Sequence, residues 1–104
     1  MTRTLAPIVM ALLCGLAAGA PIAAQAYAGE SLASEAKITL LQARAIALEA
    51  MPGTITDQEL ERERGGSGLR YSFDVKRGAA TYEVGVDAQT GAILENKPEG
   101  PNPD

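Results

Sequence analysis

Three carboxylates come closest, by type and spacing, to a chemical site in this chain. In the strand registers derived below, Glu59, Asp74 and Glu83 occupy neighbouring positions on one face of three adjacent strands. Adjacent strands lie ~4.8 Å apart, and like charges directly opposite one another are unfavourable. The simplest interpretation is a hydrated sheet surface. One functional interpretation is a binding surface for a basic segment of a protein partner, and these three are then the candidate partner-binding residues. The other is a weak Ca²⁺ site. A flat sheet face, however, supplies few of the 6–8 oxygen ligands that Ca²⁺ takes.

The residues needed for most other chemistry are missing. The chain has no His and no Trp, and Cys14 is its one cysteine. A Ser-His-Asp or Cys-His device and a zinc site of the usual nitrogen and sulfur type are therefore excluded. The glycines at 65, 66 and 68 precede a strand and no Lys-Ser/Thr follows them, so they predict a turn rather than a phosphate loop. We predict no enzymatic activity, no catalytic residues, no cofactor and no metal ligands.

The first 28 residues have the order of a secretory signal peptide. Arg3 precedes an apolar run at residues 5–20, and two small-x-small sites follow, which end at Ala26 and Ala28. This order predicts export and cleavage after Ala26 or Ala28. The apolar run is short for a membrane span, which needs ~20 residues. Leu13 is too large for the residue before a lipidated cysteine, so we expect a periplasmic or secreted protein that is not a lipoprotein and is free of the membrane after cleavage.

Charge and size limit the mature chain further. Removal of the leader takes away Arg3, which leaves eight basic residues against 13 acidic ones and a net charge of about −5. This net negative charge argues against binding to nucleic acid or to anionic lipid. The chain is long enough for one domain with a small core.

Two hairpins are predicted from strict alternation of apolar and polar residues between positions 69 and 94. A two-residue turn at Gly78-Ala79, with Gly first, is typical of a type II′ turn and aligns Phe73 with Val84. The turn that ends at Gly91 predicts a glycine bulge and a short last strand over residues 92–95, with Ile93 opposite Val86.

The charged segment at residues 54–64 is predicted as the first strand. A four-residue loop at 65–68 would place Leu60 opposite Phe73, and on the other face would pair Glu63 with Arg70 and Asp57 with Lys76. In the same register Glu59 faces Asp74. Ile55 has the wrong parity, which predicts a bulge near Thr56. If this strand lies at the edge of the sheet, it could bind an extended peptide by strand addition. Its alternating charges are also typical of an edge strand that avoids pairing with other chains.

One helix precedes these strands. Thr39 and Gln42 form a predicted capping box, and an alanine-rich stripe runs at i, i+3, i+4 spacing until Pro52-Gly53 ends the helix. The sequence thus predicts an α+β fold, one α-helix packed on a four-stranded antiparallel β-meander, at residues 38–96. Residues 29–37 are expected to be a flexible linker, and residues 97–104, with three prolines, a disordered tail.

The helix ITLLQARAIALEAMPG, the Gly-rich turn, the Tyr-x-Phe-x-Val strand at 71–75 and the YEVGVD strand at 82–87 resemble a PepSY domain. The resemblance implies a non-enzymatic protein-interaction module outside the cytoplasm that inhibits or modulates a peptidase or binds another envelope protein. It implies no set of functional residues. The alternative is a periplasmic protein that binds a small ligand or cation through the acidic outer face of the sheet.

Overall fold

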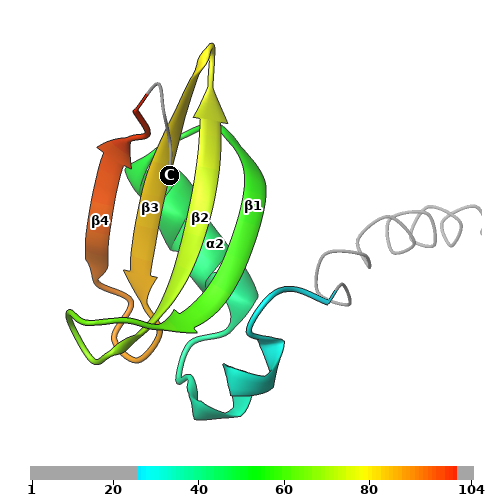
Figure 1. Cartoon of the computed structure of the whole chain (residues 1–104), viewed down its shortest axis with the longest axis vertical. Coiled ribbons are helices and arrows are strands. Elements are labelled where there is room, and N and C mark those ends of the chain that lie inside the picture. Colours follow the sequence, from blue (N-terminus) through cyan, green and yellow to red (C-terminus); the bar gives the residue numbers. More distant parts are fainter. Residues whose placement is uncertain (1–25, 101–104) are drawn as a thin grey trace, which may run out of the picture.

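The computed structural model describes residues 26–100 and confirms the predicted α+β fold. Its elements follow in the order η2 (Glu30–Glu35), α2 (Leu40–Ala50), β1 (Thr54–Arg62), β2 (Leu69–Arg77), β3 (Ala80–Asp87) and β4 (Ile93–Pro98). The strands form one antiparallel sheet in the order β1-β2-β3-β4, and α2 crosses behind it (Figure 1). The predicted signal peptide lies almost wholly outside the described residues.

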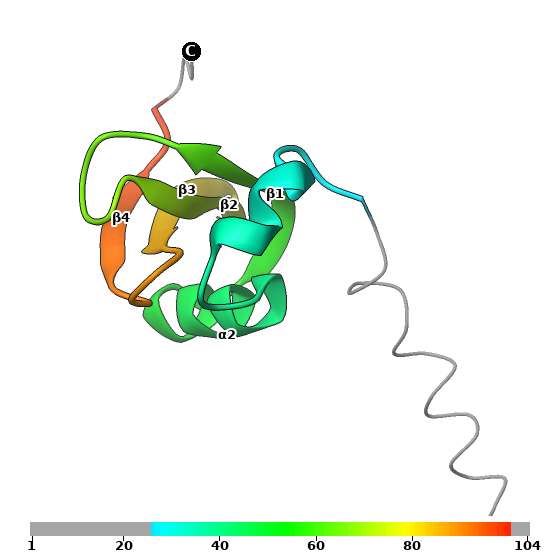
Figure 2. The ribbon, with the colours of Figure 1, turned by 90° about the horizontal axis from the view of Figure 1, so that it is seen from below.

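The helix begins and ends where the sequence predicts. The Gln42 N–H donates to Thr39 Oγ1 at 3.1 Å and the Thr39 N–H donates to Gln42 Oε1 at 2.8 Å, which completes the capping box. Ala43 and Ala47 are fully buried, because a face of methyl groups lets the helix lie close to the sheet. Figure 2 shows α2 covering one face of the sheet and leaving the other face uncovered.

The core lies between α2 and the inner face of the sheet. Tyr71, Phe73 and Val75 of β2 are 2% exposed or less, as are Val84 and Val86 of β3. The Tyr71 hydroxyl donates to the Ile38 carbonyl at 2.9 Å, so this buried phenol also fixes the chain that enters the helix. The alternation between positions 69 and 86 therefore identified the buried face correctly.

The last two turns have the predicted registers. Phe73 pairs with Val84 across the Gly78-Ala79 turn, where Gly78 has φ 65° and Ala79 does not have a positive φ, as a type II′ turn requires. Val86 pairs with Ile93, and the register shifts between Gly85 and Val86. A two-residue turn leaves little freedom of register, which explains why the pairing of Phe73 with Val84 could be predicted.

The first hairpin has the predicted parity but not the predicted register. Leu60 faces Tyr71 rather than Phe73, because β1 ends at Arg62 and six residues, 63–68, connect it to β2. The predicted pairs of Glu63 with Arg70 and of Asp57 with Lys76 are therefore wrong. The shift is by two residues, which keeps Leu60 in the core. The bulge near Thr56 is confirmed, since the register changes between Ile55 and Asp57.

Two segments that were predicted to lack structure have it. Residues Glu30–Glu35, within the predicted linker, form the 3₁₀-helix η2 against β1, where Arg62 makes an ion pair with Glu35 at 2.5 Å. At the other end β4 continues to Pro98, so Lys97 and Pro98 are strand residues and not tail. Pro98 is tolerated because β4 is an edge strand, whose outer side needs no N–H donor. Residues 101–104 of the predicted tail lie outside the described part of the chain.

None of the helices among residues 26–100 has the length and apolar character needed to cross a bilayer.

Candidate partner-binding face

The structure brings two of the three predicted site residues directly opposite one another. Asp74 of β2 pairs with Glu83 of β3. Glu59 does not face Asp74, because the first hairpin is shifted by two residues. Its partner is Ser72, and Asp57 takes the place opposite Asp74. Glu59 remains on the same face of the sheet, one position further along the row.

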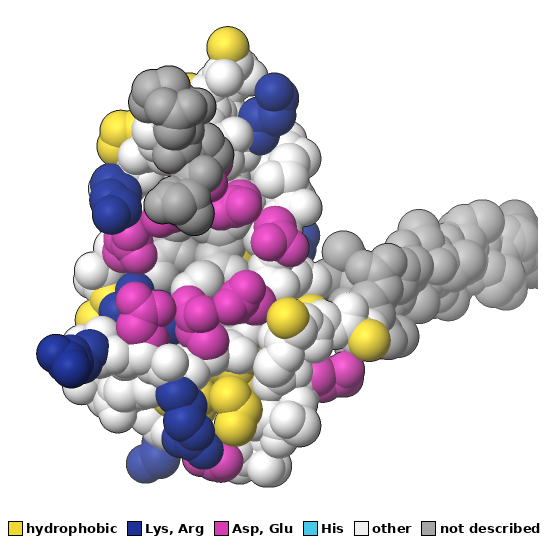
Figure 3. Space-filling model, in the orientation of Figure 1, with side chains coloured by type: hydrophobic (Ala, Val, Ile, Leu, Met, Phe, Trp, Pro, Cys, Tyr) yellow, Lys and Arg dark blue, Asp and Glu magenta, His cyan; other side chains and the backbone are white. Residues whose placement is uncertain are grey.

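These side chains belong to a larger acidic surface, which we call the acidic face. It is an open hollow of about 580 Å³ on the side of the sheet that α2 leaves uncovered, and Figure 3 shows carboxylates gathered there. Eight acidic residues and one basic residue, Lys97, line it. The acidic ones are Asp57, Glu59, Glu61, Glu63, Asp74, Glu83, Glu95 and Glu99. More than half of the 13 acidic residues of the chain therefore share one surface.

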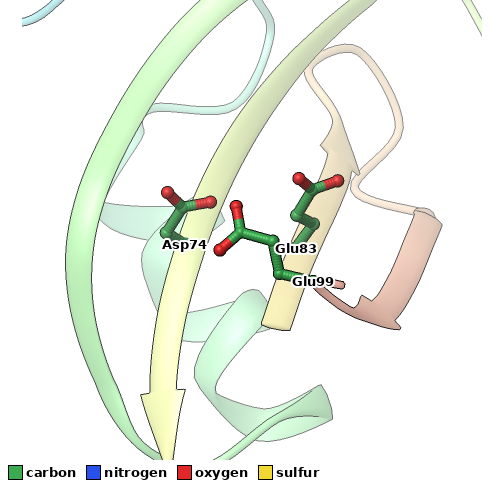
Figure 4. A group of neighbouring side chains, drawn as sticks. All are labelled: Asp74, Glu83 and Glu99. Carbon is green, nitrogen blue, oxygen red and sulfur yellow. The ribbon is translucent and has the colours of Figure 1, made fainter. Parts of the chain in front are cut away.

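Glu99 is a member of this face that the sequence did not reveal. Carboxylate oxygens of Asp74, Glu83 and Glu99 all lie within 4.8 Å of one another, and Figure 4 shows Glu99 between the other two. The Glu99 N–H donates to the Thr81 carbonyl at 2.8 Å, which extends the pairing of β4 with β3 beyond Pro98. The three prolines after position 97 obscured this, since they indicate a chain end rather than a strand.

Partial burial and neighbouring negative charges raise the pKa of the two carboxyls at the centre of the face, Asp74 and Glu83. Partial burial, followed by the charges of Glu99 and Asp57, raises the pKa of Asp74 above its ordinary value. Partial burial and the neighbouring Glu95 and Glu99 raise the pKa of Glu83, and Lys97 opposes this only in part. The ionised face is thus electrostatically unfavourable by itself, and a bound cation would relieve it.

Among the carboxyls of this face, Glu59 has the pKa that is raised furthest above its ordinary value. A hydrogen bond with Glu61, together with burial and the charges of Glu61, Asp57 and Asp74, raises the pKa of Glu59 to about 7. Burial alone would raise the pKa of Glu61 as well, but the hydrogen bonds it accepts from Glu59 and from the Ser72 hydroxyl at 2.6 Å lower it. As the pH falls below about 7, the two side chains therefore share one proton, with Glu59 as the donor.

Basic residues neutralise only one side of the face. Arg70 Nη1 lies 3.2 Å from Glu95 Oε1, and Lys97 Nζ lies 3.2 Å from Glu95 Oε2. Arg70 also donates to the Arg64 carbonyl at 3.1 Å, and its side chain is only 8% exposed. Both cations are directed at Glu95, so Asp74, Glu83 and Glu99 have no ion pair shorter than 4.0 Å to a residue of the described chain.

One more carboxylate, Asp87, is buried and has a different role. It is 2% exposed and accepts hydrogen bonds from the Ser67 N–H and hydroxyl at 2.7 and 2.8 Å and from the Gln89 N–H at 2.8 Å. Burial acts to raise the pKa of Asp87, but these bonds outweigh it and hold the pKa below its ordinary value. Asp87 therefore joins the loop at 63–68 to the β3–β4 turn and does not contribute to the acidic face.

The outer edge of β1, considered above as a peptide-binding edge, is partly occupied by the chain itself. The Leu60 N–H donates to the Ala28 carbonyl at 2.9 Å, and Ala28 forms a parallel bridge with Glu59. A partner strand would have to displace this segment or pair with the edge beyond it.

Fold and face together define a small α+β domain with one sheet face in the core and the other lined by carboxylates. A family model described as "Peptidase propeptide and YPEB domain", PepSY, matches residues 37–97. This is most of the chain and nearly the range 38–96 predicted above, so the chain belongs to the PepSY family. Neither the comparison with curated proteins nor that with solved structures finds a match.

Proposed function

We propose that this chain is an exported, non-enzymatic protein-interaction module that binds a basic segment of a peptidase, or of another envelope protein, on its acidic face and thereby restrains or modulates it. The family supports the peptidase, since its description names peptidase propeptides. The absence of His from the sequence, and of Cys beyond the predicted leader, supports a role without covalent chemistry. The single observation that carries the proposal is the gathering of eight carboxylates with one lysine in an uncovered hollow.

A basic segment suits this face better than a small molecule does. The hollow is about 580 Å³ and open, so it does not enclose a ligand as a small-molecule pocket would. Its carboxylates come from all four strands and from the residues directly after β1 and β4, and they can engage several Lys or Arg side chains at once. Each ion pair formed there also removes part of the repulsion that raises the pKa values of Asp74 and Glu83.

The binding can be tested with an oligolysine peptide and the purified protein. We expect saturable binding that weakens as salt is added, and no binding of an oligoglutamate peptide of the same length. The double variant Asp74→Asn/Glu83→Gln should lose about three- to tenfold in affinity, since exposed ion pairs contribute up to about 1 kcal/mol each. The matched control is Glu49→Gln, an exposed charge on α2 outside the acidic face, which should not change the affinity.

The peptidase part of the proposal needs its own experiment. Exported peptidases would be assayed with and without the purified protein, and those affected would be assayed again with the double variant. Inhibition or stabilisation by the wild-type protein that the double variant loses and Glu49→Gln retains supports the proposal. No effect on any exported peptidase, together with no oligolysine binding, would refute it.

A second candidate, binding of a divalent cation, is favoured by the 4.8 Å grouping of Asp74, Glu83 and Glu99. Three carboxylates offer six oxygens, the lower limit of what Ca²⁺ takes. Calorimetric titration separates the two functions: a metal site gives one-to-one binding of Ca²⁺ that Glu99→Gln abolishes. Heat with oligolysine and none with Ca²⁺ leaves the protein-interaction function as the better supported one.

A further inference from the structure

The predicted leader offers two small-x-small cleavage sites, and the structure distinguishes between them. Cleavage after Ala26 leaves Tyr27 as the first residue, and cleavage after Ala28 leaves Gly29. We infer that the leader is removed after Ala26, because Tyr27 and Ala28 belong to the folded domain. This inference rests on the proposed export of the chain and adds to it the identity of the mature N-terminus.

Ala28 closes part of the exposed edge of the sheet. Its carbonyl accepts the Leu60 N–H at 2.9 Å, and the two chains form a parallel bridge at Glu59. Leu60 is a core residue of the edge strand β1 and is 2% exposed. A chain that began at Gly29 would leave this N–H without its acceptor and would lengthen the open edge, which favours pairing between copies of the chain.

Gly29 allows the backbone of the N-terminal segment to lie close to β1. It has φ 83°, a conformation that side chains disfavour, and a Cβ at this position would lie 1.7 Å from the Leu60 carbonyl oxygen. Only glycine allows the backbone so near to β1. The contact would serve little purpose if the two residues before it, which complete the pairing with β1, were removed with the leader.

Tyr27 contributes a side chain to the same arrangement. It packs against the core cluster, and its phenol lies close to that of Tyr71. Burial, followed by the neighbouring Tyr27, raises the pKa of Tyr71. The Tyr27 carbonyl accepts the Glu30 N–H at 3.1 Å, just before η2 begins. Loss of Tyr27 would therefore uncover part of the core and release the start of the 3₁₀-helix.

The test is the intact mass of the chain recovered from the periplasm of a bacterial host that expresses all 104 residues. A mass that corresponds to residues 27–104 supports the inference. A mass that corresponds to residues 29–104 overturns it and leaves the export intact. The full-length mass, found only inside the cell, overturns both the inference and the exported location in the proposed function.

Two single substitutions make the assignment independent of any later trimming. Ala28→Leu blocks only the second site, since it places a large residue directly before that cut, and the mature chain should again begin at Tyr27. Ala24→Leu blocks only the first site, and it should leave the chain unprocessed or move the cut to Ala28. The reverse pattern, in which Ala28→Leu prevents processing and Ala24→Leu does not alter it, would contradict the inference.

The same variants report on the fold. If Ala24→Leu yields a chain that begins at Gly29, this chain should melt at least about 5 °C below the chain that begins at Tyr27, because it lacks the Ala28 hydrogen bond and the Tyr27 packing. Equal melting temperatures would show that the two residues do not stabilise the domain.

Discussion

At the scale of single residues, Asp87 makes the most concentrated set of polar contacts in the described chain. Four donors surround its carboxylate, namely the Ser67 N–H and hydroxyl and the N–H groups of Gln89 and Thr90. Two loops that are distant in the sequence depend on this one side chain. Its contribution is therefore structural, although its burial and charge could suggest a catalytic acid.

Asp87→Asn should destabilise the protein by about 2–3 kcal/mol, since it replaces hydrogen bonds to a charged acceptor with weaker ones and turns an N–H₂ group toward donors. Urea unfolding at pH 7 measures the loss. Asp57→Asn, an exposed carboxylate with the same chemical change, serves as the control and should change the stability by less than about 0.5 kcal/mol.

The stability that Asp87 contributes should depend on pH. Because the folded pKa of Asp87 lies below its unfolded value of ~3.9, the wild-type advantage is present above that pH and disappears as the pH falls through the folded pKa.

Glu59 should give the opposite pH dependence. Its folded pKa, about 7, lies above the ordinary value of 4.5, so folding is favoured when Glu59 is protonated and this stability is lost as the pH rises between those two values. We expect the wild-type melting temperature to fall between pH 5 and pH 8, by an amount that solvent screening of this partly exposed group keeps small. In Glu59→Gln the fall should be shallower. Equal slopes in the wild type, in Glu59→Gln and in the control Glu30→Gln would contradict the shared proton with Glu61.

At the scale of elements, the sequence predicted those pairings that short-range geometry determines. The Gly78-Ala79 turn has two residues, so alternation alone aligned β2 with β3 and placed Asp74 opposite Glu83. The first hairpin closes through a longer loop, whose extent depends on Ser67 binding Asp87, 20 residues away in the sequence. Nothing in the local pattern of β1 signals that contact, and the shifted register moved Glu59 away from Asp74.

The two missed segments, η2 and the end of β4, have the same explanation. Both are polar and rich in small residues or proline, and both are ordered by contacts with distant strands rather than by their own propensity. η2 contains no buried residue and is fixed through Gly29, Ala28 and the Arg62–Glu35 pair, whereas β4 ends in the Glu99 bond to Thr81. Consequently the sequence revealed Asp74 and Glu83 of the candidate site and missed Glu99, which lies between them.

A matched pair of glycines tests how the N-terminal segment is attached. Gly29 and Gly78 both have positive φ, but a Cβ at Gly78 would meet no atom within 4 Å, whereas one at Gly29 would meet the Leu60 carbonyl oxygen. Gly78→Ala should cost only the backbone strain, about 1–2 kcal/mol. Gly29→Ala should displace the segment from β1 and increase hydrogen exchange at the Leu60 amide. Protection of that amide in Gly29→Ala equal to that in Gly78→Ala would show that the segment does not cover the edge.

At the scale of the whole molecule, repulsion among the carboxylates of the acidic face opposes folding. Salt screens repulsion between exposed charges, with a Debye length of ~10 Å at 0.1 M. The melting temperature should therefore rise with added sodium chloride between about 0.02 M and 0.5 M, measured by calorimetry. Asp74→Asn/Glu83→Gln should be as stable as the wild type or more so, by up to about 1 kcal/mol, and less sensitive to salt. A double variant that is markedly less stable than the wild type would mean that these carboxylates support the fold.

The division of the sheet into an apolar inner face and an acidic outer face also makes the molecule electrically one-sided. Negative potential extends from the side opposite α2, and the clustering of like charges in a hollow concentrates it (Figure 3). A positively charged protein that diffuses nearby would experience a torque before any atoms touch, and it would arrive with its basic region already turned toward the strands. The association rate would then be high at low ionic strength and low at high ionic strength, even if the final complex were packed equally well under both conditions.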